Sequence, residues 1–166
     1  MKTSRLTKLN SYLSFKLGEE TFGVNVGSVL SILKMIRITK IPCAPDYLRG
    51  VINLRGEVLP VIDLRLRLGM AGTQMTMGTC ILVMELRHKE IEINVGIMVD
   101  SVSEVHTIEP NEILAPPFMA SKFRTEFIEG MYKDGEGFIM LLEMNNIFNN
   151  TELDEISSSI QKIEAA

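Results

Sequence analysis

Few side chains in this sequence have the types and spacing that catalysis or metal binding requires. The chain has two histidines, His88 and His106, and neither stands at a metal-ligand spacing such as HExxH. We expect both to be surface or packing residues. Carboxylates are plentiful, but no pair is marked out for acid–base work, and no nucleophile elbow or Walker pattern occurs. The sequence therefore predicts no enzyme activity, no metal site and no cofactor.

A glycine-rich stretch, Asp134–Gly137, has a composition that resembles a phosphate-binding loop. Such a loop leads into a helix, because the N-terminal amides of the helix contact the anion. Here the apolar run Phe138–Leu142 follows, which is typical of a strand. The stretch is therefore predicted to be a hairpin turn.

One arginine stands where it could bind a partner. Arg55 and Gly56 separate two apolar runs, Gly50–Leu54 and Val58–Leu64, and are predicted to form the tip of a hairpin. Gly56 can supply the positive φ that a tight turn needs. Arg55 is then either a solvated turn residue or a guanidinium positioned for a partner's carboxylate. The residues alone leave both interpretations open.

Composition and charge restrict the class of partner. Apolar residues make up 46% of the 166 residues and charged residues 23%, which is typical of one globular domain. The net charge of -4 offers no broad basic field for nucleic acid. Residues 1–70 carry eleven Lys and Arg against five Asp and Glu, and residues 71–166 carry six against sixteen. A basic half and an acidic half could associate head to tail.

The cysteines and the N-terminus indicate a compartment. Cys43 and Cys80 are too few for a disulfide framework and fit buried thiols in a reducing environment. The N-terminal residues lack the apolar core of a signal peptide, and the longest apolar runs are strand-sized. We therefore expect a cytoplasmic protein that reaches a membrane only through something else.

The elements that must position these side chains are strands. Apolar and polar residues alternate in Tyr12–Leu17 and in Ile91–Val99, and turn residues separate such runs. Pro60 lies within the run Val58–Leu64, where it marks an edge position or a bulge, because proline cannot donate a ladder hydrogen bond. The pattern predicts an all-β fold.

The chain also contains an internal repeat. Residues 47–68 align with residues 127–148 at an offset of 80, and Gly23–Ile32 aligns with Gly96–Val105 at an offset of 73. We infer two similar β-subdomains, about 12–70 and 79–150. After them the period changes to that of a helix over residues 151–166, with Thr151 as N-cap and Asp154 as its capping partner, and this helix is expected to pack on the barrels.

The most specific segment of the sequence is Ile41–Leu64. It contains a proline-bearing loop, the motif G-V-x-N-L-R-G at Gly50–Gly56, a short strand with Pro60 and a closing Asp63-Leu64. This combination resembles the CheW family of chemotaxis coupling proteins. Family-like stretches also occur at Gly96–Val105 and Phe127–Gly130. The resemblance spans about residues 11–150, so the whole chain, 1–166, is expected to be a single CheW-like domain.

This resemblance implies a fold and a function. The fold is two SH3-like five-stranded β-barrel subdomains packed together, with short helices and a C-terminal helix. The function is that of a non-catalytic adaptor that couples the cytoplasmic tips of methyl-accepting chemoreceptors to the regulatory domain of the histidine kinase CheA. Such a protein is recruited to membrane receptor arrays without entering the membrane. We expect a monomer in isolation, and rings only together with the kinase.

Matching residue by residue carries a set of partner-binding positions over to this chain. They are Val29, Ser31, Arg55, Cys80, Gly96, Val102 and Val105. The three valines could equally be barrel core. Ser31 departs from the family, which commonly has a glutamate there that would pair with the arginine matching Arg55. Glu104, the repeat counterpart of Ser31, keeps an acid in the other half.

Other interpretations remain open at this stage. The chain could serve a non-flagellar chemosensory pathway, or it could be an input module like that of CheV without its receiver, which would need roughly another 120 residues. A small barrel could also bind an oligonucleotide. That function needs aromatic residues on a basic groove, and the ten aromatic residues fall mostly at inward strand positions.

Overall fold

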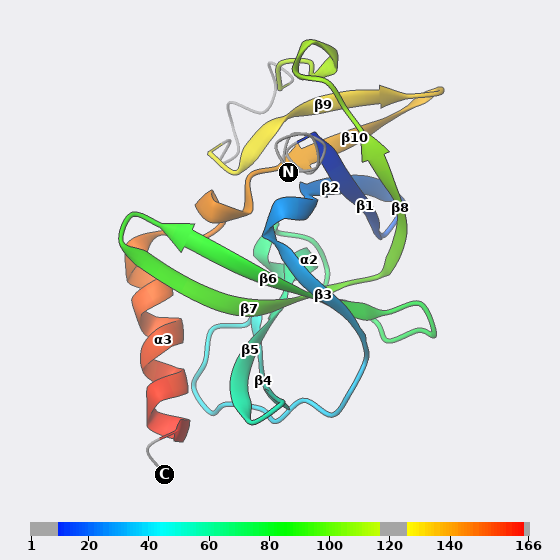
Figure 1. Ribbon diagram of the computed structural model, residues 1–166. Helices are drawn as coiled ribbons and strands as arrows, with labels where there is room; N and C mark the ends of the chain where they lie inside the picture. Colours follow the sequence, from blue (N-terminus) through cyan, green and yellow to red (C-terminus); the bar gives the residue numbers. More distant parts are fainter. Residues whose placement is uncertain (1–9, 117–125, 165–166) are drawn as a thin grey trace. The chain divides into compact units, whose positions relative to one another are not determined.

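The computed structural model describes residues 10–116 and 126–164, which divide into two compact units (Figure 1). Unit 1 comprises Met1–Ser28 and Ser101–Ile147, and unit 2 comprises Val29–Asp100 and Phe148–Ala166. Each unit contains one curled five-stranded sheet. The predicted all-β fold with two five-stranded subdomains, short helices and a C-terminal helix is thereby confirmed.

The sheet of unit 1 has the strand order β8-β1-β2-β10-β9. Its strands are β1 (Ser11–Leu17), β2 (Glu20–Asn25), β8 (Ser101–Thr107), β9 (Ile128–Asp134) and β10 (Gly137–Leu142). Short 3-10 helices η1 (Val26–Ser28), η2 (Pro110–Glu112) and η4 (Met144–Asn146) belong to the same unit. All neighbouring strands pair antiparallel except β10 and β2, which are parallel.

The sheet of unit 2 has the order β3-β6-β7-β5-β4, with β5 and β7 parallel. Its strands are β3 (Val29–Lys34), β4 (Leu48–Leu54), β5 (Glu57–Asp63), β6 (Cys80–His88) and β7 (Ile91–Val99). Helix α2 (Leu64–Arg67) follows β5, and the C-terminal helix α3 (Asn150–Glu164) contacts β5 and β7. The core cluster of unit 2 contains Ile52, Leu59, Val61, Ile81, Val83 and Met98.

Each sheet takes two strands from one predicted range and three from the other, which corrects the predicted contiguous subdomains. β3 follows β2 along the chain but pairs with β6, and β8 follows β7 but pairs with β1. Each sheet therefore draws strands from both predicted ranges, 12–70 and 79–150. The repeat shows which strands resemble each other, but pairing is a nonlocal choice that the resemblance does not fix.

The registers of the paired strands show the same repeat as the sequence. Leu48 pairs with Ile62 in one unit and Ile128 with Leu142 in the other, which is the predicted offset of 80. The backbone bond from Asp63 N to Tyr47 O and that from Glu143 N to Phe127 O are both 2.7 Å. The two halves are therefore copies of one structural plan.

A glycine allows the same close approach in each copy. An isolated bridge joins Thr39 to Val51, and its counterpart joins Leu114 to Met131. A Cβ at Gly50 would collide with the carbonyl oxygen of Thr39, and a Cβ at Gly130 would lie 2.7 Å from the carbonyl oxygen of Leu114. The glycine that begins the G-V-x-N-L-R-G motif therefore serves packing.

Pro60 lies in an interior strand rather than at the predicted edge or bulge. β5 runs between β7 and β4. Pro60 faces Val51, whose own backbone N–H and C=O bond to Thr39 on the far side. The parallel pairing with β7 begins one residue later, at Val61. The proline is tolerated because no ladder hydrogen bond requires its missing N–H.

The N-cap of the C-terminal helix lies two residues before the predicted one. Asn149, not Thr151, caps it: the Asn149 side chain accepts from Glu152 N at 2.8 Å, and the Glu152 side chain accepts from Asn149 N at 3.0 Å. Leu153 and Ile156 are buried, whereas Ile163 is 37% exposed. Among the described residues, no helix is long and apolar enough to cross a membrane.

Candidate functional site

The Arg55 hairpin forms as the sequence predicts. Leu54 pairs with Glu57, so Arg55 and Gly56 alone make the turn between β4 and β5. Their φ angles are 52° and 85°, and this pair of left-handed residues matches the right-handed twist of the strands. Asn53 supports the turn by accepting the Gly56 N–H at 3.1 Å. The predicted positive φ of Gly56 is confirmed.

Arg55 is exposed, and among the residues that the structure describes it makes no hydrogen bond or ion pair. Its repeat counterpart is Gly135, which has a φ of 61°. A glycine takes this conformation without steric penalty, whereas a side chain makes it costly. The turn alone therefore gives no reason for an arginine, which favours the interpretation that its guanidinium serves a partner.

Ser31 lies on β3, which is an edge strand of the unit 2 sheet. It is exposed and stands opposite Val83 on β6. Its neighbours Leu30 and Ile32 are 53% and 49% exposed. An edge strand that presents apolar side chains is a surface suited to a protein partner.

β3 and the Arg55 hairpin each contribute a residue that packs against the core cluster of unit 2. Leu33, two residues after Ser31, and Leu54, the residue before Arg55, both pack against that cluster. Cys80 begins β6 beside this region, where it pairs with Lys34 of β3, and it is half-buried. Ser31, Arg55 and Cys80 therefore all belong to unit 2.

The remaining predicted positions divide between surface and interior. Val105 on β8 is 59% exposed, so it is not barrel core, while Val29 and Val102 are half-buried. Gly96 is buried in β7, and a Cβ there would lie 2.8 Å from the Ile81 side chain. Gly96 therefore makes room for core packing, and its partner-binding role stays a prediction.

The cysteines also depart from their predicted burial. Cys43 is exposed, with a φ of 61°, and Cys80 is half-buried. Cys43 lies in the loop between β3 and β4, where a bend places its backbone in the left-handed region. The composition of the loop, with a proline on either side of Cys43-Ala44, was a signal that this segment is irregular rather than core.

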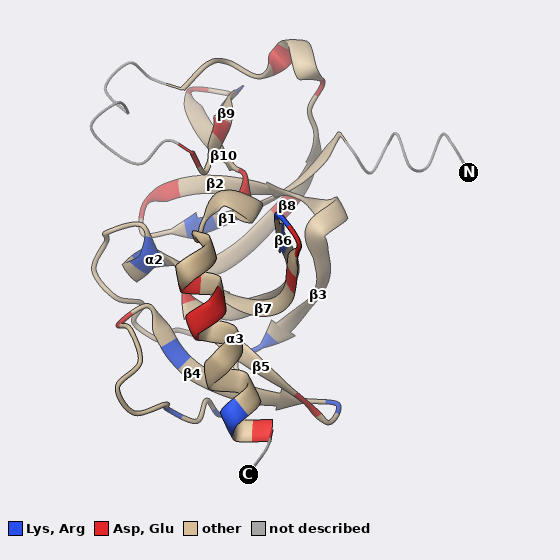
Figure 2. Ribbon diagram, turned by 90° about the vertical axis from the view of Figure 1, so that its left-hand side faces the viewer, with Lys and Arg blue, Asp and Glu red and all other residues tan. Residues whose placement is uncertain are grey.

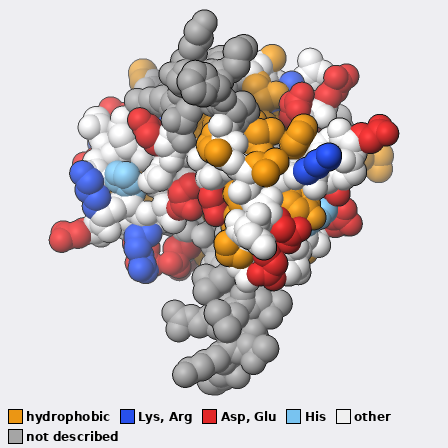
Figure 3. Space-filling view, turned by 90° about the horizontal axis from the view of Figure 1, so that it is seen from above, with side chains coloured by type: hydrophobic (Ala, Val, Ile, Leu, Met, Phe, Trp, Pro, Cys, Tyr) orange, Lys and Arg blue, Asp and Glu red, His pale blue; other side chains and the backbone are white. Residues whose placement is uncertain are grey.

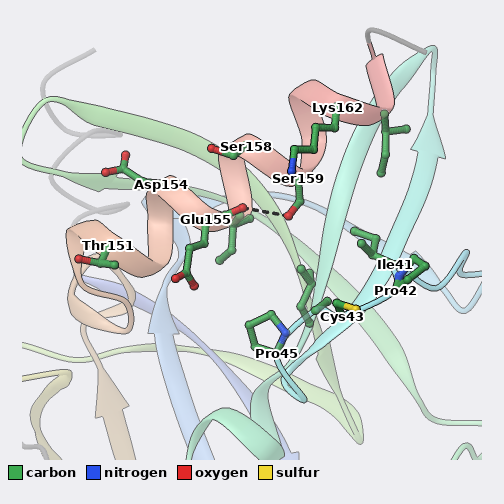
Figure 4. A pocket seen from close by; sticks show the side chains of 14 residues that line it. Ile41, Pro42, Cys43, Pro45, Thr151, Asp154, Glu155, Ser158, Ser159 and Lys162 are labelled. Carbon is green, nitrogen blue, oxygen red and sulfur yellow. Dashed lines mark hydrogen bonds between the residues drawn. The ribbon is translucent and has the colours of Figure 1, made fainter.

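Sequence reasoning missed a groove beside this loop. The loop and helix α3 enclose about 840 Å³, with Cys43 and Pro45 on one wall and Glu155, Ser159 and Lys162 on the other (Figure 4). The signal that could have revealed it is the apolar stripe of the helix, whose last residue, Ile163, lines the groove instead of the core.

Charge and exposed apolar residues distinguish unit 1. Ten Asp and Glu side chains stand against two Lys in its residues 10–28, 101–116 and 126–147. Figure 2 shows acidic residues on β9 and η2. Figure 3 shows hydrophobic side chains gathered on the face seen from above. Among the described residues of this unit, the exposed large apolar ones are Val105, Leu114 and Phe138.

Comparison with known proteins identifies the family. The family profile described as a CheW-like domain matches residues 11–152. The probable chemotaxis protein CheW of Rhizobium etli is 37% identical over 84% of this chain and 88% of its own length. The chemotaxis protein CheW of Rhizobium meliloti is 35% identical over the same shares.

A solved structure agrees with this result. The scaffolding protein TtCheW from Thermoanaerobacter tengcongensis superposes with a TM-score of 0.75 at 32% identity, covering 86% of this chain and 90% of that one. A profile match over most of the chain, relatives above 30% identity and a shared two-subdomain β fold lead to one conclusion. The chain belongs to the CheW family.

Proposed function

We propose that this protein is a non-catalytic adaptor that couples chemoreceptors to a CheA-type histidine kinase in chemotaxis. The observation that carries the proposal is the match to proteins named CheW over nearly the whole length of both chains. The same coverage makes a CheV-like input module the weaker alternative. The CheW family is one of scaffolds without catalysis, which agrees with the lack of a catalytic motif in the sequence.

The proposed contact with the kinase centres on unit 2. Arg55 presents a guanidinium that has no partner among the described residues, at the tip of a two-residue hairpin turn, and β3 offers exposed Leu30 and Ile32 along a sheet edge. Exposed apolar side chains and arginine are the common composition of protein–protein hot spots. Val29, Ser31 and Cys80 border this surface and complete the proposed site.

The second proposed surface lies on β8 of unit 1, around Val102 and Val105. It would serve the receptor tip or a second kinase contact. The acidic excess of unit 1 favours a partner surface with basic residues. In this proposal the protein works on the cytoplasmic side of receptor arrays and is held there by its partners. Rings would form only with the kinase.

Calorimetric titration with the regulatory domain of a CheA from the same genome tests the proposal. The expected result is saturable one-to-one binding. Absence of saturable binding to every CheA regulatory domain that the genome encodes would overturn the kinase-coupling function. The same titration with a receptor cytoplasmic fragment tests the other half of the adaptor role.

The variant Ser31→Glu decides what the family departure at this position means. Because Ser31 is exposed on an edge strand, the substitution should leave the fold intact. We expect the affinity of Ser31→Glu for the CheA domain to stay within tenfold of that of the natural chain. In the natural complex a carboxylate other than one at position 31 would serve Arg55. Ser158→Glu, an exposed helix position with the same charge change, is the control. A large gain in Ser31→Glu alone would mean that the natural chain serves a different kinase.

A further inference from the structure

Unit 1 contains a cluster of metal-ligating side chains that the sequence spacing conceals. Glu104 and His106 lie two residues apart on β8, and Asp134 ends β9. One ligand atom from each of the three lies within 4.8 Å of the others. Nε2 of His106 is 3.5 Å from Oε1 of Glu104. The curled sheet brings β8 and β9 together although they stand at opposite ends of the strand order.

The histidine ring is held in place by the strands around it. Its side chain is 14% exposed, and its centroid lies 6.2 Å from that of Tyr132 on β9. The Oγ of the buried Ser14 lies 3.2 Å from Nε2 of His106. The same Oγ donates its one proton to the carbonyl of Glu104 and accepts its N–H, so in the contact with Oγ the ring nitrogen Nε2 is the donor. Ser14 therefore holds both the ring and the backbone of Glu104 in place, and a metal ion would bind the ring at Nδ1 or displace the proton from Nε2.

We call the junction between β8 and the end of β9 the seam of the unit 1 sheet. The other copy of the repeat shows that the fold does not require a histidine and two carboxylates at such a seam. The counterparts of Glu104, His106 and Asp134 are Ser31, Leu33 and Leu54, by the offsets of 73 and 80. Leu33 and Leu54 pack against the core cluster of unit 2. Two apolar residues and an exposed serine therefore stand at one seam, whereas the equivalent seam carries an imidazole and two carboxylates.

Charge favours a cation at the polar seam. Over its full ranges, Met1–Ser28 and Ser101–Ile147, unit 1 has ten Asp and Glu against seven Lys and Arg, so its net charge is -3. No lysine or arginine among the described residues forms an ion pair with Glu104 or Asp134. The carboxylates therefore repel each other across the seam unless a positive charge lies between them.

We propose that Glu104, His106 and Asp134 form a binding site for a divalent transition-metal ion of the Zn²⁺ type. One imidazole nitrogen with two carboxylate oxygens is a set that suits Zn²⁺, and water completes the coordination. Mg²⁺ and Ca²⁺ prefer oxygen ligands alone and are not expected to compete. The bound ion links β8 to the β9–β10 turn and thereby closes the barrel of unit 1.

Titration of the full chain with ZnCl₂ by calorimetry, in a non-chelating buffer, tests the site. All proteins carry Cys43→Ser, which removes the exposed thiol. The chain supplies matched controls: His88 is its only other histidine, and Glu136 is an exposed acid in the same turn as Asp134. His106→Gln and Asp134→Asn are compared with His88→Gln and Glu136→Gln, and thermal melting verifies that each variant is folded.

The expected result is saturable one-to-one binding that both site variants weaken at least tenfold and both controls leave unchanged. Zn²⁺ should also raise the melting temperature of the parent and not of Asp134→Asn. Absence of saturable binding by the parent up to millimolar Zn²⁺ would overturn the proposal, as would binding that survives the site variants. If His106→Gln fails to fold, Asp134→Asn decides the matter, because Asp134 is an exposed turn residue.

Discussion

The fully buried carboxylate of Asp63 is held by the guanidinium of Arg49, whose Nε and Nη2 donate to one oxygen at 3.0 and 2.9 Å. Thr73 donates its backbone N–H to that same oxygen and its hydroxyl to the other. The second oxygen also accepts the backbone N–H groups that begin α2. The closing Asp of the family motif is therefore a structural residue that joins β4, β5, α2 and the following loop.

Asp63→Asn should destabilise the protein severely. The amide cannot accept as many bonds, and its own N–H groups would face the donors of Arg49 and Thr73. We expect a loss of about 3 kcal/mol or more in the free energy of unfolding, as for other broken buried pairs. Urea unfolding measures it, with Glu57→Gln, an exposed acid on the same strand, as control. A loss no larger than that of the control would contradict this role.

Arg55→Gly should distinguish the stability of the turn from the contribution of the arginine side chain to binding. Glycine is the residue at the equivalent tip, Gly135, so the unfolding free energy should stay level or rise by up to about 1 kcal/mol. Affinity for the CheA regulatory domain should fall at least tenfold. Lys89→Gly is the matched control, because Lys89 is an exposed basic residue with a φ of 56° at another hairpin tip. Equal affinities for the two variants would remove Arg55 from the proposed site.

Gly96→Ala should test whether Gly96 makes room for packing of the core. The new methyl would lie 2.8 Å from Ile81 and 3.4 Å from Leu59 in the core, so we expect a loss of about 1–3 kcal/mol in the free energy of unfolding. Gly137→Ala is the control, since its nearest contact is an ordinary 3.8 Å. Similar stability of both variants in chemical unfolding would mean that the core yields at Gly96.

Two residues on the apolar stripe of α3 should behave differently. Leu153 is 1% exposed, and Leu153→Ala should cost about 2–4 kcal/mol because it leaves a cavity against unit 2. Ile163→Ala, at a 37% exposed position in the groove, should change stability by less than about 0.5 kcal/mol. Thermal melting distinguishes the two. A large loss at Ile163 would show that the end of the helix is packed in solution.

The raised pKa of Tyr12 predicts that the free energy of unfolding declines at alkaline pH. Burial, together with the hydrogen bond that its hydroxyl donates to Glu129 at 2.9 Å, raises the pKa of Tyr12 from 10.0 to about 12. Since the folded state keeps the proton longer than the unfolded state, this contribution is full below pH 10 and is lost as pH rises to 12. Unfolding of Tyr12→Phe, measured by urea titration, should therefore depend less on pH in that window. Parallel curves for both proteins would refute the prediction.

Local patterns in the sequence determined the character of most elements. Alternation in Tyr12–Leu17 and Ile91–Val99 predicted strands, and both are strands in the structure. The repeat predicted two copies of one plan, and the Arg55-Gly56 pair predicted a hairpin tip with a positive φ. These features depend on residues near each other in the chain, so a single sequence carries them.

Tertiary structure alone decided which strands share a sheet and which side chains meet. β3 and β8 have similar patterns, so either could complete either sheet, and only the course of the chain after β2 and β7 assigns them. The same curling of a sheet brings His106 beside Asp134, 28 positions away and invisible to spacing motifs. Strand pairing and closure of a sheet depend on contacts between distant residues, whose free energies no local pattern records.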